Sequence, residues 1–227
     1  LARLAVIATD SIRVVSLSQE SEIRRHIPKN SIQFVYSPVP IDFSKISSDL
    51  NVSQNHQIAF VGRLHKERGT KLFSQIAAKI IQENEFASIV IAGSGPEEVW
   101  LKNRLEAENV INAIEFRGEL TGTELLKLYR ESRILISTAP YESYGLSIRE
   151  AALNGLYVAA LDNSGVREAI LDFPDLIASF KTLDQAVRLI SEMLDRPHTK
   201  SSDGAIRRQI IRDEEACYRL AESWILA

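Results

Sequence analysis

The sequence predicts an α/β protein built on a doubly wound, Rossmann-like parallel sheet, and three observations lead to this prediction. Short apolar runs recur along the chain, they alternate with helical patterns, and most of them are nearly continuous in Ile, Val, Leu and Ala. Continuous apolar strands are typical of parallel sheets, because helices cover both faces of such sheets. Regular alternation of strands and helices indicates crossover connections between parallel strands.

The individual elements follow in chain order. Six apolar runs predict strands at residues 12–17, 32–36, 58–61, 89–92, 134–137 and 157–161. Helical patterns predict helices at residues 70–82, 97–108, 123–131, 146–154 and 183–194. Three helix starts carry a local signal. Thr121 with Glu124, and Ser147 with Glu150, have the spacing of a capping box, and Pro96 stands where the first residue of a helix is expected.

Outside the alternating strands and helices, the sequence predicts loops and a final helix. A polar stretch at 44–57 predicts a linker or loop, residues 196–204 predict a second loop, and residues 205–226 predict a final helix. The first residue is Leu1 rather than Met, and it stands inside a helical pattern. We therefore expect the chain to be a fragment of a longer protein.

Composition excludes several classes of function. The chain has 227 residues, 45% hydrophobic and 25% charged, which is typical of a globular protein with a sizeable core. The net charge of -3 gives no reason to expect nucleic acid as a partner. No apolar stretch is long enough to span a bilayer. The single cysteine, Cys217, cannot form an internal disulfide, which fits a cytoplasmic location.

The loops that follow the predicted strands are where a ligand is expected, because ligands of open α/β sheets bind beyond the carboxyl ends of the strands. Four such loops contain glycines: residues 62–69, 93–96, 140–145 and 163–165. Glycines let the backbone approach a ligand closely, and two of the loops lead into helix N-termini, which favour anions. Arg63 and Arg68 add positive charge to the first loop. These features favour an anionic, phosphate-bearing ligand.

Residues 137–154 combine a strand end, a loop, a helix start and two carboxylates, Glu142 and Glu150. Taken alone, each feature also has a purely structural interpretation. Glu150 could complete a capping box, Glu142 could favour a helix N-terminus, and the arginines could be solvated loop charges. The sequence has no HExxH motif and no cysteine pair, so no metal site is expected. It also lacks GxSxG and Walker A motifs, which weakens hydrolase and NTPase interpretations.

Five motifs in order carry a family resemblance: VGRLHKERG, IAGSGP, IEFRGEL, YESYGLSIREAALNG and VAALDNSGVREAI. The series resembles the C-terminal, donor-binding half of the retaining GT-B glycosyltransferases of family 4, also called glycosyl transferases group 1. The resemblance runs from about residue 12 to 170. It implies that residues 1–45 are a remnant of an N-terminal domain with its linker. Residues 46–200 are then a Rossmann-like domain that binds a nucleotide-sugar, and residues 201–227 are a crossing helix.

The resemblance also implies roles for individual residues. Arg63 and Arg68 match positions that contact the donor diphosphate, and Glu142 matches the acid that faces the transferred sugar. Glu150 matches the acid that holds the nucleotide ribose. The other implied donor-binding residues are Gly62, Gly93, Ser94, Arg117, Gly118, Leu120, Ser143, Tyr144, Gly145 and Leu146. Arg68 stands where a lysine is usual, which keeps the charge but replaces a point charge by a planar fork.

The activity that the resemblance implies is transfer of a hexose-type sugar, with retention, from a nucleotide-sugar to a glycan, lipid-linked or small-molecule acceptor, as in polysaccharide biosynthesis. No cofactor or metal is expected. The acceptor-binding N-terminal domain is missing, so we expect the fragment alone to be inactive, and any peripheral membrane contact would run through that missing half. The alternatives are a non-catalytic nucleotide-sugar-binding module, a GT-B epimerase or a glycan phosphorylase. The complete charged set favours the transferase, the spacing of the two glutamates argues against the epimerase, and no lysine is marked for pyridoxal phosphate.

Overall fold

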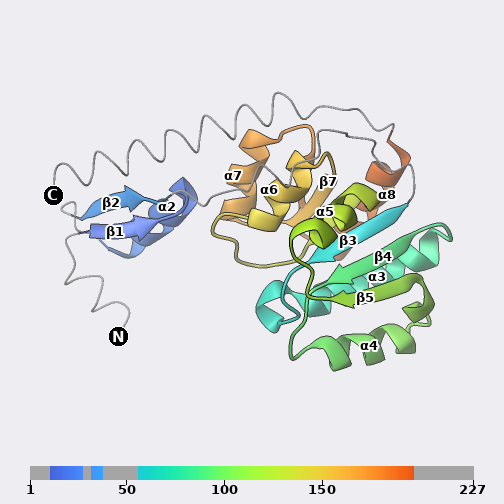
Figure 1. Cartoon of the computed structure of the whole chain (residues 1–227). Helices are drawn as coiled ribbons and strands as arrows, with labels where there is room; N and C mark the ends of the chain where they lie inside the picture. The colour runs from blue at the N-terminus through green and yellow to red at the C-terminus, as the bar shows by residue number, and fades with distance from the viewer. Residues whose placement is uncertain (1–10, 28–31, 38–55, 197–227) are drawn as a thin grey trace.

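The computed structural model describes residues 11–27, 32–37 and 56–196 and contains a six-stranded sheet with helices on both faces (Figure 1). The strand order is β5-β4-β3-β6-β7-β8, and every neighbouring pair is parallel. The strands are β3 (Gln57–Val61), β4 (Ser88–Ala92), β5 (Ile114–Gly118), β6 (Ile134–Ser137), β7 (Tyr157–Leu161) and β8 (Ile177–Phe180). The predicted doubly wound α/β fold is therefore confirmed.

Six helices flank this sheet. One layer contains α3 (Thr70–Glu83), α4 (Glu98–Ala107) and α8 (Leu183–Asp195), and the other contains α5 (Gly122–Glu131), α6 (Leu146–Leu153) and α7 (Ser164–Asp172). Two short 3₁₀ helices, η2 (Lys66–Arg68) and η3 (Ile111–Ala113), precede α3 and β5. The core side of α3 shows why these segments are helical. Phe73, Ile76 and Ile80 recur at helical spacing and are buried, and the Phe73 ring lies 4.4 Å from that of Phe60 on β3.

The order of the strands reverses between β3 and β6. From β3 the chain moves outward through β4 to β5, then returns to place β6 on the other side of β3. The loops after β3 and β6 therefore leave the same sheet edge toward opposite helix layers. In open α/β sheets this reversal point is where ligands bind.

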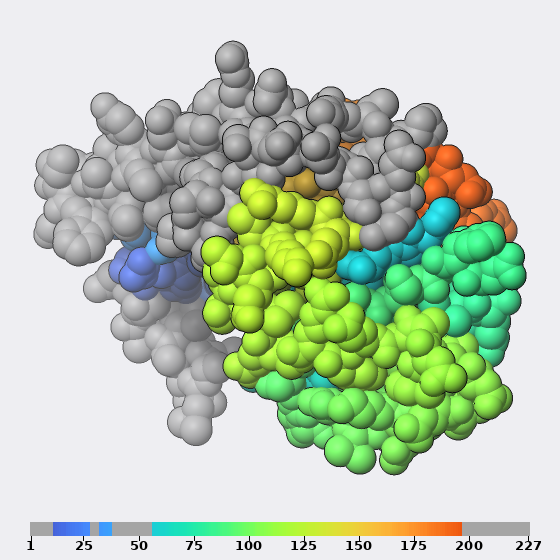
Figure 2. All heavy atoms as spheres, turned by 45° about the vertical axis from the view of Figure 1, so that its right-hand side comes forward, coloured from blue at the N-terminus to red at the C-terminus, as the bar shows by residue number. Residues whose placement is uncertain are grey.

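A smaller unit precedes the six-stranded sheet. β1 (Ser11–Val14) and β2 (Gln33–Tyr36) form a separate two-stranded parallel sheet, connected by α2 (Leu17–His26). α2 packs against α7, and the Ser18 backbone N–H donates to Glu168 Oε2 at 3.0 Å. Figure 2 shows this blue unit on the opposite side of the molecule from the green α4 region. Its origin in an N-terminal domain stays a prediction.

Several predicted boundaries are wrong. The strand predicted at 12–17 ends at Val14, because Ser16 caps α2 through a bond from the Gln19 N–H. The strands β5 and β8 and the helices α2 and α7 were not predicted as such. β5 and β8 are edge strands, and only part of their residues is buried, so their apolar patterns are weak. Residues 164 and 165 belong to the first turn of α7 instead of a loop.

The three predicted helix starts also need correction. α6 has Gly145 as its N-cap, so Ser147 and Glu150 are its second and fifth residues and cannot form a capping box. Thr121 is the N-cap of α5 as expected, but its side chain makes no capping bond. α4 begins at Glu98, two residues after Pro96.

Some predictions lie outside the described residues. They are the linker up to residue 55, the loop from residue 197, the helix at 205–226 and Cys217. The proposed division at residues 45 and 200 falls there too and stays a prediction. In the part of the chain that the structure describes, no helix is both long and apolar enough to cross a membrane.

Candidate functional site

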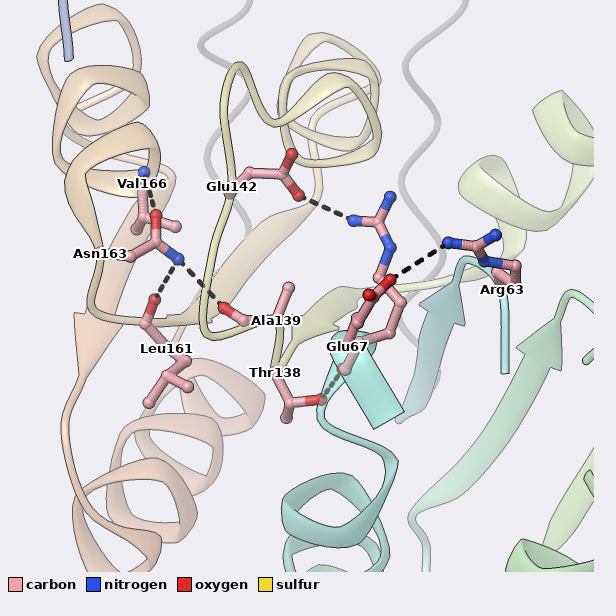
Figure 3. A network of polar contacts seen from close by, with 9 residues as sticks. Arg63, Glu67, Thr138, Ala139, Glu142, Leu161, Asn163 and Val166 are labelled. Atoms are coloured by element: carbon pink, nitrogen blue, oxygen red, sulfur yellow. Dashed lines mark hydrogen bonds and ion pairs between the residues drawn. The ribbon is translucent and has the colours of Figure 1, made fainter. Parts of the chain in front are cut away.

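An ion pair joins the two loops at the strand-order reversal. Arg68 ends η2 after β3, and Glu142 lies in the loop after β6, 74 residues later. Arg68 Nη1 donates to Glu142 Oε2 at 3.0 Å, with 40% of the arginine side chain and 13% of the glutamate side chain exposed. Figure 3 shows the Glu142 carboxylate turned toward this guanidinium. The structure therefore brings together two residues that the sequence assigned to one site.

The backbones of the same two loops are in direct contact. The buried Thr138 hydroxyl donates to the Arg68 carbonyl at 2.8 Å. Gly69 follows Arg68 in the left-handed region, with φ of 71°, and a Cβ there would lie 2.0 Å from the Thr138 carbonyl oxygen. Only glycine fits between the loops, so the position of Arg68 is set by a tight backbone crossing.

Replacing Thr138 by valine tests this link. The hydroxyl is lost at nearly constant volume, and the Arg68 carbonyl loses a donor, so we expect the free energy of unfolding to fall by about 1–2 kcal/mol. Thr123→Val, at an exposed position of α5, is the control and should change stability by less than about 0.5 kcal/mol. Urea unfolding of both variants measures the difference, and equal values would show that the hydroxyl does not hold the loop.

Two helices begin at this edge with glycine N-caps. α3 starts after Gly69 and α6 after Gly145, which has φ of 75°. Glycine has no side chain to accept from the first amide N–H groups, whereas the side chains of Ser16, Asn163 and Thr182 cap α2, α7 and α8. Uncapped N-terminal amides together with the helix dipole favour a bound anion. The two helices flanking the reversal point therefore offer donors that α2, α7 and α8 satisfy with a side chain, while α4 and α5 also lack a side-chain capping bond.

The loop between β6 and α6 is fixed from the α7 side (Figure 3). Asn163 Nδ2 donates to the carbonyls of Ala139 and Leu161 at 3.1 Å, while Asn163 Oδ1 accepts from Val166 N–H. Further along the loop, a Cβ on Gly165 would lie 2.1 Å from the Glu142 carbonyl oxygen. These contacts hold Glu142 in place through its backbone as well as through its carboxylate.

A buried arginine holds the end of this loop. Arg149 is fully buried; its Nε donates to the Tyr144 carbonyl at 2.9 Å, its Nη1 pairs with Asp172, and its guanidinium lies 4.5 Å from the Tyr144 ring centroid. Tyr144 is therefore packed inward, while its neighbours Ser143 and Leu146 are exposed beside the N-terminus of α6. The tyrosine side chain therefore shapes the loop from its buried side.

Glycines also begin the loops after β3 and β4, and β4 lies on the opposite side of β3 from β6. Gly62 N–H donates to the Ala92 carbonyl at 2.9 Å and Gly93 N–H to that of Gly118 at 2.6 Å. Ser94 Oγ donates to Glu119 Oε1 at 2.5 Å. Arg63 is the most solvent-facing predicted cation, with 64% of its side chain exposed and a 3.4 Å contact to Glu67 (Figure 3). An incoming anion could recruit it without breaking a buried contact.

Arg117 is held by acids of its own neighbourhood. Its guanidinium bonds both oxygens of Glu115 at 2.9 Å and lies 3.4 Å from Glu131. The bond to Glu115 raises the pKa of Arg117 above its ordinary value, in spite of partial desolvation. Leu120 packs against the core. The side chain of Arg117 is consequently held by these carboxylates, next to the Gly93 loop.

Glu150 has a partner on α5. The Tyr129 hydroxyl donates to Glu150 Oε2 at 3.2 Å, and the tyrosine is only 3% exposed. The sequence motifs assign no role to Tyr129, Thr138, Arg149 or Asn163. The first three are buried, and nothing in the sequence separates such residues from packing residues, while Asn163 was predicted only as part of a loop.

Among residues 11–27, 32–37 and 56–196, no group of His, Cys, Asp and Glu side chains could hold a metal ion.

Comparison with protein families decides the affiliation. Residues 42–211 match the family "Glycosyl transferases group 1", which covers most of the chain. The chain belongs to this glycosyltransferase family. The glycogen synthase of Mycobacterium tuberculosis is 28% identical over 116 residues, which are 51% of this chain and 28% of that protein. The 2-deoxystreptamine glucosyltransferase of Streptomyces kanamyceticus is 24% identical over 165 residues, covering 72% of this chain and 43% of that protein.

Solved structures of GT-B glycosyltransferases share the fold of this family member. The sucrose-phosphate synthase of Thermosynechococcus elongatus superposes with a TM-score of 0.80 at 16% identity, covering 99% of this chain and 60% of that one. Anabaena HepE in complex with UDP-glucose superposes with a TM-score of 0.76 at 14% identity, covering 96% of this chain and 64% of that one. The chain spans less than half the length of the curated relatives it matches.

Proposed function

We propose that this chain binds the nucleotide-sugar donor of a retaining glycosyltransferase, which transfers a hexose-type sugar to a glycan, lipid-linked or small-molecule acceptor. The observation that carries the proposal is the Arg68–Glu142 pair, which lies between two glycine-capped helix N-termini at the reversal point. The proposal is supported by the family membership of the chain. It is also supported by the location of this pair at the sheet edge where α/β proteins bind ligands. A facing N-terminal domain would supply the acceptor site, so transfer requires more than this chain.

The positive charges and amide donors of the site suit the departure of a nucleoside diphosphate. Negative charge develops on the leaving phosphate oxygens, and Arg68, Arg63 and the first amides of α3 and α6 are donors that could stabilise it without a metal. The guanidinium of Arg68 has five N–H donors, so one arm can keep its bond to Glu142 while others reach a phosphate. The diphosphate subsite would then lie directly beside Glu142.

Glu142 is proposed to hydrogen-bond the sugar and stabilise an oxocarbenium-like transition state. Its Oε2 already accepts from Arg68, so we assign the hydrogen bond with a substrate hydroxyl to its second oxygen. We assign it this electrostatic role rather than that of a covalent nucleophile. Glu150 would bind the ribose. The cytoplasmic location and a role in polysaccharide biosynthesis stay predictions.

Thermal unfolding with nucleoside diphosphates tests donor binding. UDP, GDP and ADP at millimolar concentration should raise the Tm of this chain, with one base preferred. At a ligand concentration of about 100 Kd, the stabilisation is about 2.7 kcal/mol, or roughly 5–10 °C for a chain of this size. The matched controls are uridine, guanosine and adenosine, which lack the diphosphate and should give much smaller shifts. If none of the three diphosphates moves the Tm, the proposal fails.

A further inference from the structure

The contact between Tyr129 and Glu150 goes beyond packing. Tyr129 lies near the end of α5 and Glu150 in the middle of α6, so the 3.2 Å hydrogen bond ties together two helices of the same layer. The tyrosine is almost completely buried, whereas Glu150 is only half-buried. One carboxylate oxygen is therefore fixed on the protein side of a residue that still reaches solvent.

The direction of the hydrogen bond is set by the environment of the phenol. Burial, followed by the charge and the hydrogen bond of Glu150, raises the pKa of Tyr129 well above its ordinary value. The hydroxyl therefore keeps its proton and donates to the carboxylate. A donor on Oε2 restricts rotation of the carboxylate.

A simple packing role is the alternative. Buried tyrosines usually find a partner for the hydroxyl, and the ring of Tyr129 belongs to the core. Two observations favour more than packing. Glu150 is not part of a capping box, because α6 begins at Leu146, so its carboxylate has no role at the start of the helix. The helix that carries Tyr129 also starts shortly after Arg117, Gly118 and Leu120, three of the residues that the family resemblance assigns to donor binding.

We propose that Tyr129 is a positioning residue for ribose recognition: its hydrogen bond to Oε2 of Glu150 orients the carboxylate that accepts from a ribose hydroxyl of the donor. This inference rests on the proposed function, since it requires that the chain binds a nucleoside diphosphate. Tyr129 itself does not touch the ligand. Substitution of Tyr129 should therefore weaken only ligands that carry ribose hydroxyls, and only when Glu150 is present.

Titration calorimetry with three probes tests this dependence. They are the nucleoside diphosphate that gives the largest Tm shift, its 2′,3′-dideoxy analogue and inorganic pyrophosphate. Tyr129→Phe should weaken binding of the ribonucleotide by about tenfold, the scale of a hydrogen bond to a charged group, and leave the other two Kd values unchanged. The matched control is Tyr36→Phe, which removes a similar tyrosine–glutamate bond, to Glu20 in the β1–α2–β2 unit, and should change none of them.

A double-mutant cycle with Glu150→Gln completes the test. If Tyr129 acts through Glu150, the double variant should bind the ribonucleotide about as weakly as Glu150→Gln alone. An unchanged ribonucleotide Kd for Tyr129→Phe would overturn the inference, and so would equal losses for all three probes or strictly additive losses in the cycle. If the wild-type chain binds no nucleoside diphosphate, the proposed function fails first and the inference falls with it.

Discussion

Replacing Arg68 by alanine should weaken binding of nucleoside diphosphates by about 10- to 100-fold, the largest single effect on affinity that we expect. Charge-assisted hydrogen bonds are worth about 1.5–3 kcal/mol, and this guanidinium is the cation at the reversal point of the sheet. Its loss also leaves Glu142 without the donor that holds its Oε2. Calorimetric titration with the preferred diphosphate measures the change.

The matched control is Arg104→Ala on α4. Arg104 pairs with Glu108 and has 46% of its side chain exposed, close to the value for Arg68. Its removal should change the diphosphate Kd by less than about twofold, because a surface ion pair contributes little. Similar losses for both variants would mean that general charge, not the site, attracts the ligand.

Arg68→Lys separates charge from geometry. An ammonium keeps the positive charge but lacks the planar fork, so it cannot bridge Glu142 and a phosphate with the same spread of donors. We expect most of the pyrophosphate affinity to return in this variant. The sugar transfer proposed above should stay reduced, since the position of Glu142 depends on the bridge.

Replacing Gly69 by alanine should lower the free energy of unfolding by about 3 kcal/mol or more. The new Cβ would lie 2.0 Å from the Thr138 carbonyl oxygen, at a left-handed φ of 71°. The left-handed conformation alone costs about 1–2 kcal/mol, and overpacking against a rigid backbone adds about 1–3 kcal/mol. Because the crossing loops also position Arg68, the surviving folded protein should bind diphosphates more weakly.

Gly118→Ala isolates the steric part of this effect. Gly118 has a similar φ of 66°, but nothing lies within 4 Å of a Cβ built there. Its substitution should cost only the conformational part, about 1–2 kcal/mol. Denaturant unfolding of the two variants gives the comparison, and equal losses would contradict a tight crossing between the loops after β3 and β6.

The sequence predicted the central part of the fold well, for a physical reason. β6 and β7 are buried on both faces, so their apolar runs begin and end with the strands, and their predicted bounds agree with the structure. The edge strand β5 contains Glu115 and Arg117, which face solvent and interrupt the pattern. α7 begins with Ser164 and Gly165, which resemble a loop until the Asn163 cap is seen in three dimensions.

The candidate site, like the fold, could be predicted from the sequence only in part. The family motifs placed Arg68 and Glu142 in one site, but the bond between them joins residues far apart in the chain, which no local pattern encodes. The role of Thr138 could not be predicted either, because it depends on a carbonyl 70 residues earlier. Arg149 interrupts the apolar face of α6, and its pairing with Asp172 depends on α7, which brings that carboxylate beside it.

The backbone crossings at Gly69 and Gly165 also limit how this site can change over evolution. Both glycines lie against a neighbouring carbonyl with no room for a side chain, so insertions or shifts of the main chain there would disrupt the contact. Tyr141 and Ser143, in the loop after β6, and Leu146, the first residue of α6, have exposed side chains and carry no such restraint. Under the proposed function, adaptation to a new donor sugar is consequently easiest by exchange of these outward side chains on an unchanged backbone, which makes them the first positions for a specificity library.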